Sequence, residues 1–162
     1  MTTDHYTIPG LDSAAADEIV NMLDGRMVSL IDLALTLKHV HWNVVGAGFI
    51  AVHEMLDPQV DAVRLMSDAL AERIAALGGT PVGTPGALVA RRTWDDYGPA
   101  KASVADHLAA LDIVYTGIIE DHRLAQGRLA DLDPVSEDMV IGQLGELEQF
   151  QWFIRAHLEN AG

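Results

Sequence analysis

Apolar residues recur three or four positions apart through most of this 162-residue chain, the spacing that places side chains on one face of a helix. The first long segment shows it most clearly, with a stripe made of Leu23, Met27, Leu30, Ala34 and Leu37. No segment shows the convincing alternation of a half-buried strand. The pattern therefore predicts an all-α protein.

Capping residues and glycines set the ends of the predicted helices. Asp12 and Ser13 are both favourable N-caps for the first helix, and Gly78-Gly79 is a favourable C-terminal cap for the second. Pro134 fits the first turn of the last helix. Four helices are expected, at 13–44, 49–77, 102–132 and 134–160.

A long connection separates the two predicted helical hairpins. Residues 78–100 hold three prolines and five glycines, so we expect a crossover over 78–101 with one short helix at Gly86–Arg91. Hairpin, crossover and hairpin together indicate a four-helix bundle with one long crossover. We expect one domain over 1–162, with a short tail at 1–12.

Composition and charge narrow the functions that such a bundle could have. The chain has no cysteine, which excludes disulfides, zinc–thiolate sites and thiol catalysis. Its net charge is −14, and the longest basic run is Arg91-Arg92, whereas binding to phosphate backbones requires clustered cations. Excess carboxylates suit hard metal cations, although solubility alone also explains them. Nothing resembles a signal peptide or a membrane span, so we expect a soluble cytoplasmic protein.

Residues able to bind a metal gather on one side of the second predicted helix. At 100° per residue, an arc of about 100° opposite the apolar side contains His53, Asp57, Asp61, Asp68 and Glu72. A solvated polar face is the alternative explanation. His41 lies on the apolar stripe of the first helix, where a lone histidine is often structural. It is nevertheless close enough to the turn to share a site with His53.

The spacing of these residues decides what one chain can build. The pair His53/Asp57 lies fifteen residues from the pair Asp68/Glu72, which is about 22 Å along a helix. A single chain therefore cannot close one site with both pairs, whereas a two-fold axis near the middle of the helix would bring them together twice. The mixed imidazole and carboxylate set suits Fe(II) or Zn(II). The Glu-x-x-His spacing of intrachain di-iron bundles is absent.

The stretch HVHWNVVGAGFIAVHEMLDPQVDAVRLMSDALAER resembles the signature of the Dps family, the DNA-binding proteins from starved cells, within the ferritin superfamily. The matching positions are His41-Trp42-Asn43, Gly46, Phe49, His53, Asp57, Asp68, Glu72 and Arg73. TPGALVARRTWDDY in the crossover and ELEQFQWFIRAHLE near the C-terminus are also similar to Dps, especially to its mycobacterial members.

The resemblance implies a ferritin-like fold, a hollow dodecamer and a ferroxidase centre shared between subunits. His41 and His53 would come from one subunit, Asp68 and Glu72 from its two-fold mate, and Asp57 would assist from the histidine side. These five residues are the expected catalytic and iron-binding residues. Similar proteins oxidise Fe(II), usually with hydrogen peroxide rather than oxygen, and store ferric mineral, which protects DNA.

Arg73, the acidic residues of the last turn and the remaining histidines also have expected roles. Arg73 is expected to pair with the acidic iron ligands. The acidic cluster at the last turn either lines an ion pore or is merely solvated; it consists of Asp131, Asp133, Glu137 and Asp138. The remaining histidines are expected to be structural or surface residues, namely His5, His107, His122 and His157.

DNA binding stays open at this stage. Residues 1–12 contain no lysine or arginine, unlike the basic tails through which many Dps proteins bind DNA. The remaining routes are local arginines such as Arg91 and Arg92, bridging divalent cations, or trapping of DNA in ordered arrays, and nucleoid association depends on them. The alternative functions are a nucleoid-packing protein with a vestigial metal site and a plain helical-bundle interaction protein.

Overall fold

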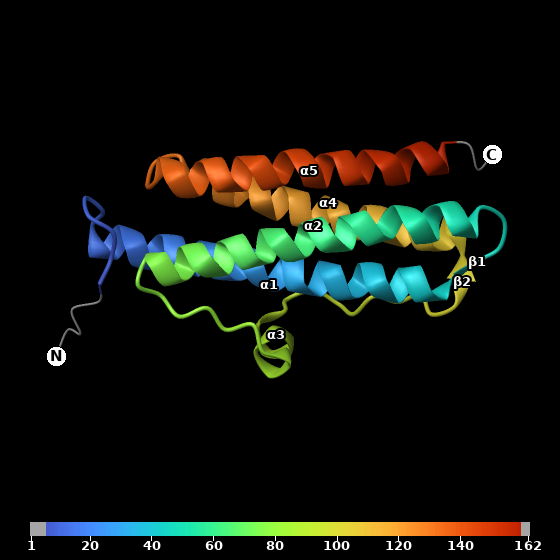
Figure 1. Cartoon of the computed structure of the whole chain (residues 1–162), viewed down its shortest axis with the longest axis horizontal. Coiled ribbons are helices and arrows are strands. Elements are labelled where there is room, and N and C mark those ends of the chain that lie inside the picture. The colour runs from blue at the N-terminus through green and yellow to red at the C-terminus, as the bar shows by residue number, and fades with distance from the viewer. Residues whose placement is uncertain (1–5, 160–162) are drawn as a thin grey trace.

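Four long helices form a bundle in the computed structural model of the chain, which describes residues 6–159. They are α1 (Ser13–Asn43), α2 (Phe49–Ala76), α4 (Val104–Leu129) and α5 (Pro134–Leu158). α1 packs mainly against α2, and α4 against α5. The crossover between the hairpins runs along the outside of the bundle and carries the short helix α3 (Pro85–Arg91) (Figure 1). The predicted all-α bundle with a helix in its crossover is confirmed.

The helices begin where the sequence supplies caps. The Asp12 carboxylate accepts a hydrogen bond from the Ala14 amide at 2.7 Å, which satisfies one of the free N–H groups at the start of α1. Gly48, with a φ of 77°, precedes α2. Asp133 caps α5 by accepting from the amide of Ser136 at 3.0 Å.

A small parallel pairing of strands departs from the prediction. β1 (Val44–Val45) pairs with β2 (Ala102–Ser103). Residues 102–103 therefore pair with β1 through their backbone, and α4 begins at Val104 rather than at 102. α4 ends at Leu129, and 130–132 form a turn instead of a final helical turn. Sequence periodicity missed β1 and β2 because a two-residue strand is too short to show alternation.

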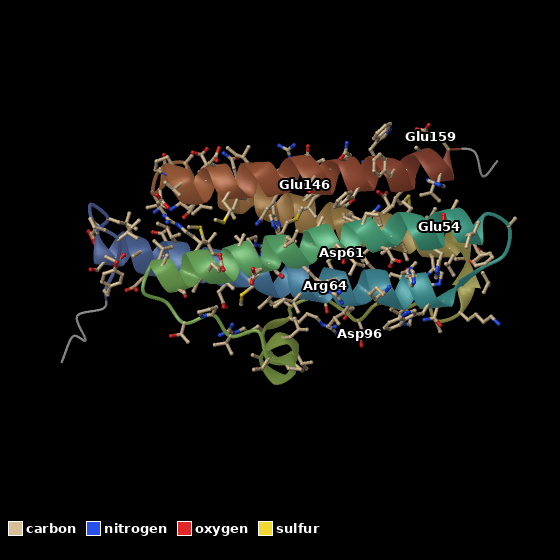
Figure 2. All side chains as sticks on the ribbon, viewed as in Figure 1. Glu54, Asp61, Arg64, Asp96, Glu146 and Glu159 are labelled. Atoms are coloured by element: carbon tan, nitrogen blue, oxygen red, sulfur yellow. The ribbon has the colours of Figure 1, made fainter. Side chains whose placement is uncertain are left out.

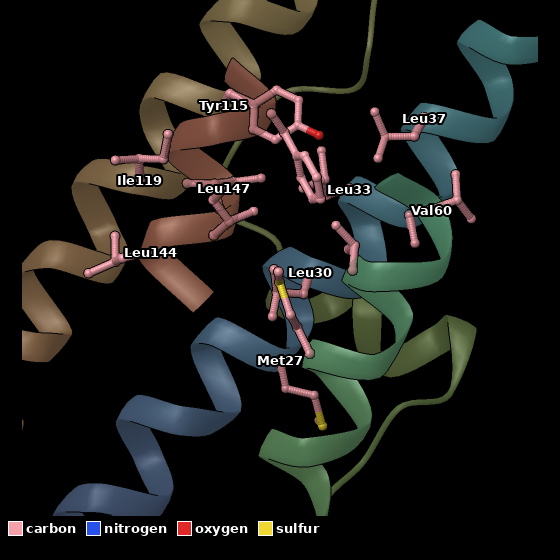
Figure 3. Packing of buried hydrophobic residues seen from close by; sticks show 14 of the residues in the cluster. Met27, Leu30, Leu33, Leu37, Val60, Tyr115, Ile119, Leu144 and Leu147 are labelled. Carbon is pink, nitrogen blue, oxygen red and sulfur yellow. The ribbon is translucent and has the colours of Figure 1, made fainter. Parts of the chain in front are cut away.

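Apolar side chains from all four long helices fill the centre of the bundle. The predicted stripe on α1 is buried throughout. Figure 3 shows Leu33 and Leu37 of α1 facing Val60 of α2 and Tyr115 of α4. The Tyr115 hydroxyl donates a 2.8 Å hydrogen bond to Gln59 Oε1, which links α4 to α2 inside the core. Within 6–159, no helix combines the length and apolar character that crossing a membrane requires.

Gly78 shapes the end of α2. Its φ is 89°, a left-handed conformation that L side chains rarely adopt. A Cβ placed there would lie 1.8 Å from the carbonyl oxygen of Tyr6. Glycine at this position therefore lets the N-terminal segment pack directly over the end of α2.

Candidate metal centre

His41 and His53 face each other where the α1–α2 hairpin turns. His41 Nδ1 lies 2.8 Å from the carbonyl oxygen of His53, and His53 Nδ1 lies 2.8 Å from the carbonyl oxygen of His41. The rings stack with their centroids 3.6 Å apart and an interplanar angle of 22°. His41 is buried and His53 is half-buried. The two histidines thus form a mutually braced pair.

This bracing settles which ring nitrogen carries the proton. A carbonyl oxygen only accepts hydrogen bonds, so each Nδ1 must donate to it. In a neutral imidazole the other nitrogen, Nε2, then keeps its lone pair. Histidine ligands of metals are oriented in this way, with one ring N–H bonded to a carbonyl and the other nitrogen on the metal. His41 and His53 are therefore prepared to act as ligands through Nε2.

Asp57 lies beside this pair but is already engaged. Its Oδ1 is 2.8 Å from Lys38 Nζ and 3.2 Å from His41 Nδ1, and 53% of its side chain is exposed. The hydrogen bond from Lys38 holds the pKa of Asp57 below its ordinary value, with smaller contributions from the neighbouring charges. Asp57 is therefore ionised at neutral pH, while Lys38 offsets its charge. The Lys38 contact was missed at the sequence level.

Asp68 and Glu72 lie farther along α2 and do not reach the histidines. Both are exposed, and in the described part of the chain neither side chain has a hydrogen bond or an ion pair. Asp68 borders a hollow of ≈ 320 Å³ between α1, α2 and the crossover. No three histidine, aspartate or glutamate side chains within 6–159 come together closely enough to hold a metal. A single subunit carries two separate parts of a possible site.

Arg73 does not pair with these acids, contrary to the prediction. Its Nη2 lies 2.5 Å from Asp133 Oδ2, and its Nε donates to Ser136 Oγ at 3.0 Å. Burial raises the pKa of Asp133, but hydrogen bonds from Ser136 and Arg73 outweigh this effect and lower it. The arginine thus ties α2 to the start of α5, and Asp133 is a buried structural residue rather than part of a solvated or pore-lining cluster.

The other members of the acidic cluster and the other histidines differ in their surroundings. Asp131 and Asp138 are exposed, and Glu137 accepts a 2.9 Å hydrogen bond from Gln126. His107 and His122 are fully buried, as expected of structural residues. His157 is exposed near the end of α5, and His5 lies outside the described residues.

Comparison with known proteins shows which family this four-helix bundle is similar to. A model of the ferritin-like domain matches residues 20–161. The DNA protection during starvation protein of Mycolicibacterium smegmatis is 57% identical over 157 residues, which covers 97% of this chain and 86% of that protein.

Two solved structures are similar over nearly their whole lengths. Mycobacterium smegmatis Dps in its tetragonal form has a TM-score of 0.96 at 57% identity, covering 100% of this chain and 97% of that one. DpsA14 from Streptomyces coelicolor has a TM-score of 0.94 at 61% identity, covering 97% and 94%. The chain belongs to the Dps family of ferritin-like proteins.

Proposed function

We propose that this chain is a subunit of an iron-oxidising and iron-storing shell, a dodecamer as the family resemblance implies. Fe(II) is its substrate, and each iron site uses His41 and His53 of one subunit with Asp68 and Glu72 of another. Asp57 assists from the histidine side. The observation that carries the proposal is the division of ligand-type residues into two well-separated groups on α1 and α2.

The residues suit the oxidation of Fe(II). Neutral Nε2 atoms bind Fe(II) without adding charge, and the carboxylates stabilise the ferric product. Two Fe(II) ions each give one electron to one hydrogen peroxide molecule, whose O–O bond breaks. With two further water molecules the products are two ferric oxyhydroxide units and four protons. Removal of both Fe(II) and peroxide protects DNA from hydroxyl radicals.

Mixing two inactive variants tests the shared site directly. His53→Ala and Asp68→Ala should each abolish rapid Fe(II) oxidation. A dimer made of one subunit of each kind contains one doubly damaged site and one intact site. Random co-assembly should therefore restore about one quarter of the wild-type rate, since isologous pairing gives two equivalent sites per dimer.

Stopped-flow oxidation with peroxide measures this restoration. Glu146→Ala controls for the loss of an acid and should keep full activity, because it removes an exposed carboxylate of α5 that has no hydrogen bond or ion pair within residues 6–159. Mixed assemblies no more active than the separate variants would exclude a shared site. Wild-type protein that oxidises no iron would exclude the ferroxidase proposal altogether.

The charges disfavour the alternative, a DNA-packing protein with a vestigial metal site. Of the ten lysines and arginines, all in the described chain, only Arg64 and Lys101 lack an ion pair with an acid. Arg91 pairs with Asp24, and Arg92 with Asp32 and Asp96. Phosphates would have to displace these carboxylates.

We therefore propose that protection does not require direct DNA binding, and that the protein acts in the cytoplasm. A gel-shift titration with chelator present, at about 0.15 M salt, should show no retarded DNA. Retarded DNA that is released as salt rises would favour the packing function and nucleoid association.

A further inference from the structure

The middle of α2 carries an acid and a base that the subunit leaves unpaired. Asp61 and Arg64 are both exposed, and within residues 6–159 neither side chain has a hydrogen bond or an ion pair. Figure 2 labels both halfway along α2. Nearly every other cation of the chain is paired, so an unpaired arginine three residues from an unpaired aspartate calls for an explanation.

The positions of these two residues relate to those of the proposed iron ligands. Two antiparallel copies of a helix, related by a two-fold axis, bring together residues that lie equally far from the axis on either side. Three pairs on α2 share one midpoint, between positions 62 and 63: His53 with Glu72, Asp57 with Asp68, and Asp61 with Arg64. The axis that would close the iron sites therefore also sets Asp61 level with the partner subunit's Arg64.

The directions of the side chains agree with this pairing. At 100° per residue, Asp61 and Arg64 lie about 60° apart, inside the arc between His53 and Glu72. Each lies about 2 Å along the helix from the shared midpoint. Leu65 is 71% exposed and falls about 20° beyond Glu72, so a second copy would also remove apolar surface from water.

We propose that Asp61 and Arg64 form two reciprocal ion pairs across the two-fold axis and so fix the register in which the iron sites close. The proposal rests on the proposed shared ferroxidase site and adds two positioning residues to it. Neither residue touches iron. Their task is to hold two copies of α2 at one axial offset.

The arrangement also disfavours neighbouring registers. If the axis shifted to Asp61, the two copies of this carboxylate would oppose each other. If it shifted to Arg64, two guanidinium groups would meet. Like charges that face each other across an interface are a common means of excluding wrong alignments. Attraction at the correct offset and repulsion on either side would together define the register.

A charge swap tests the pairing. Asp61→Arg sets two arginines against each other twice per dimer, and Arg64→Asp does the same with two carboxylates. Each should raise the concentration at which the dimer dissociates about tenfold, and more at low salt, because exposed charges interact more strongly there. The double variant Asp61→Arg/Arg64→Asp restores opposite charges and should return to within about threefold of wild type.

Two matched variants control for net charge alone. Glu146→Arg makes the same charge change as Asp61→Arg at an exposed acid of α5, and Lys101→Asp reverses the other unpaired cation. Both should associate as wild type does. Sedimentation and native mass spectrometry measure association, while circular dichroism checks that the helices remain. If a single charge-swap variant has reduced helix content, Asp61→Asn replaces it in the test and should still weaken association about threefold.

The outcomes separate the two proposals. If the ion pairs are right and the ferroxidase proposal is wrong, the association series holds while wild type oxidises no iron. If wild type oxidises iron but both single swaps associate like their controls, the register proposal is overturned. It is also overturned if the double variant associates no better than the single ones.

Discussion

The buried histidine of α4 should make the stability of the protein depend on pH. His122 is fully buried, and its Nδ1 lies 2.9 Å from the carbonyl oxygen of Ile118. Burial, together with the positive charge of Arg26, lowers the pKa of His122 from 6.5 to about 4. His122→Gln removes this titrating group and keeps a residue that favours helix.

The direction and size of this pH dependence follow from the protons that His122 binds in the folded and unfolded states. Between pH 6.5 and about 4 the unfolded chain holds a proton on His122 and the folded chain does not. Acidification therefore favours the unfolded state, and the free energy of unfolding falls as pH decreases through this window. Across the whole window the loss is about 3 kcal/mol, and between pH 7.5 and 5 it is about 2 kcal/mol.

Urea unfolding at pH 7.5, 6 and 5, at one fixed subunit concentration, measures this loss. Between pH 7.5 and 5, the free energy of unfolding should fall by about 2 kcal/mol more in wild type than in His122→Gln. Other groups contribute equally to both proteins, so the difference isolates His122. His157→Gln controls for the removal of a histidine near the end of α5. Equal pH dependence of wild type and His122→Gln would show that folding does not lower the pKa of His122.

Three further changes test local contacts. Lys38→Met frees the Asp57 carboxylate from its 2.8 Å ion pair, and binding of Co(II), measured by titration, should tighten roughly twofold to fivefold, the range set by the strength of an exposed ion pair; unchanged affinity would mean that Asp57 does not assist the site. Tyr115→Phe leaves the buried Gln59 without its hydroxyl donor and should cost about 1–3 kcal/mol in urea unfolding, whereas a loss near zero would contradict this. Gly78→Ala introduces a Cβ at a φ of 89° and should cost more than about 1 kcal/mol and expose the N-terminal segment to proteases; resistance equal to wild type would count against that packing.

Local signals in the sequence predicted most of the fold. Helical periodicity and the caps gave the starts of α1, α2 and α5 because these signals act within a few residues of one another. The start of α4 was wrong because β2 pairs with β1, fifty-eight positions away in the chain. Such a pairing is decided by tertiary contact and leaves no local pattern at 102–103.

The candidate site was predictable in composition but not in contacts. Helix geometry showed that Asp68 and Glu72 could not join His53, because that conclusion needs only the rise per residue. The reciprocal bonding of the two histidines depends on how α1 and α2 pack, which a helical wheel does not contain. The wrong partner for Arg73 has the same origin, since Asp133 reaches it from a distant part of the chain.

The two sides of α2 have different roles in the fold and in the proposed site. Its apolar side holds the subunit together, while its other side carries half-sites that one subunit leaves open. Neither open part offers enough ligands to enclose an iron ion, so under the proposed function a lone subunit would bind Fe(II) poorly. Oxidation would then begin only where two subunits have met in register. Because the site is divided between two subunits, iron oxidation would depend on assembly and would need no separate regulatory element. One face of α2 would then specify both the subunit pairing and the iron site.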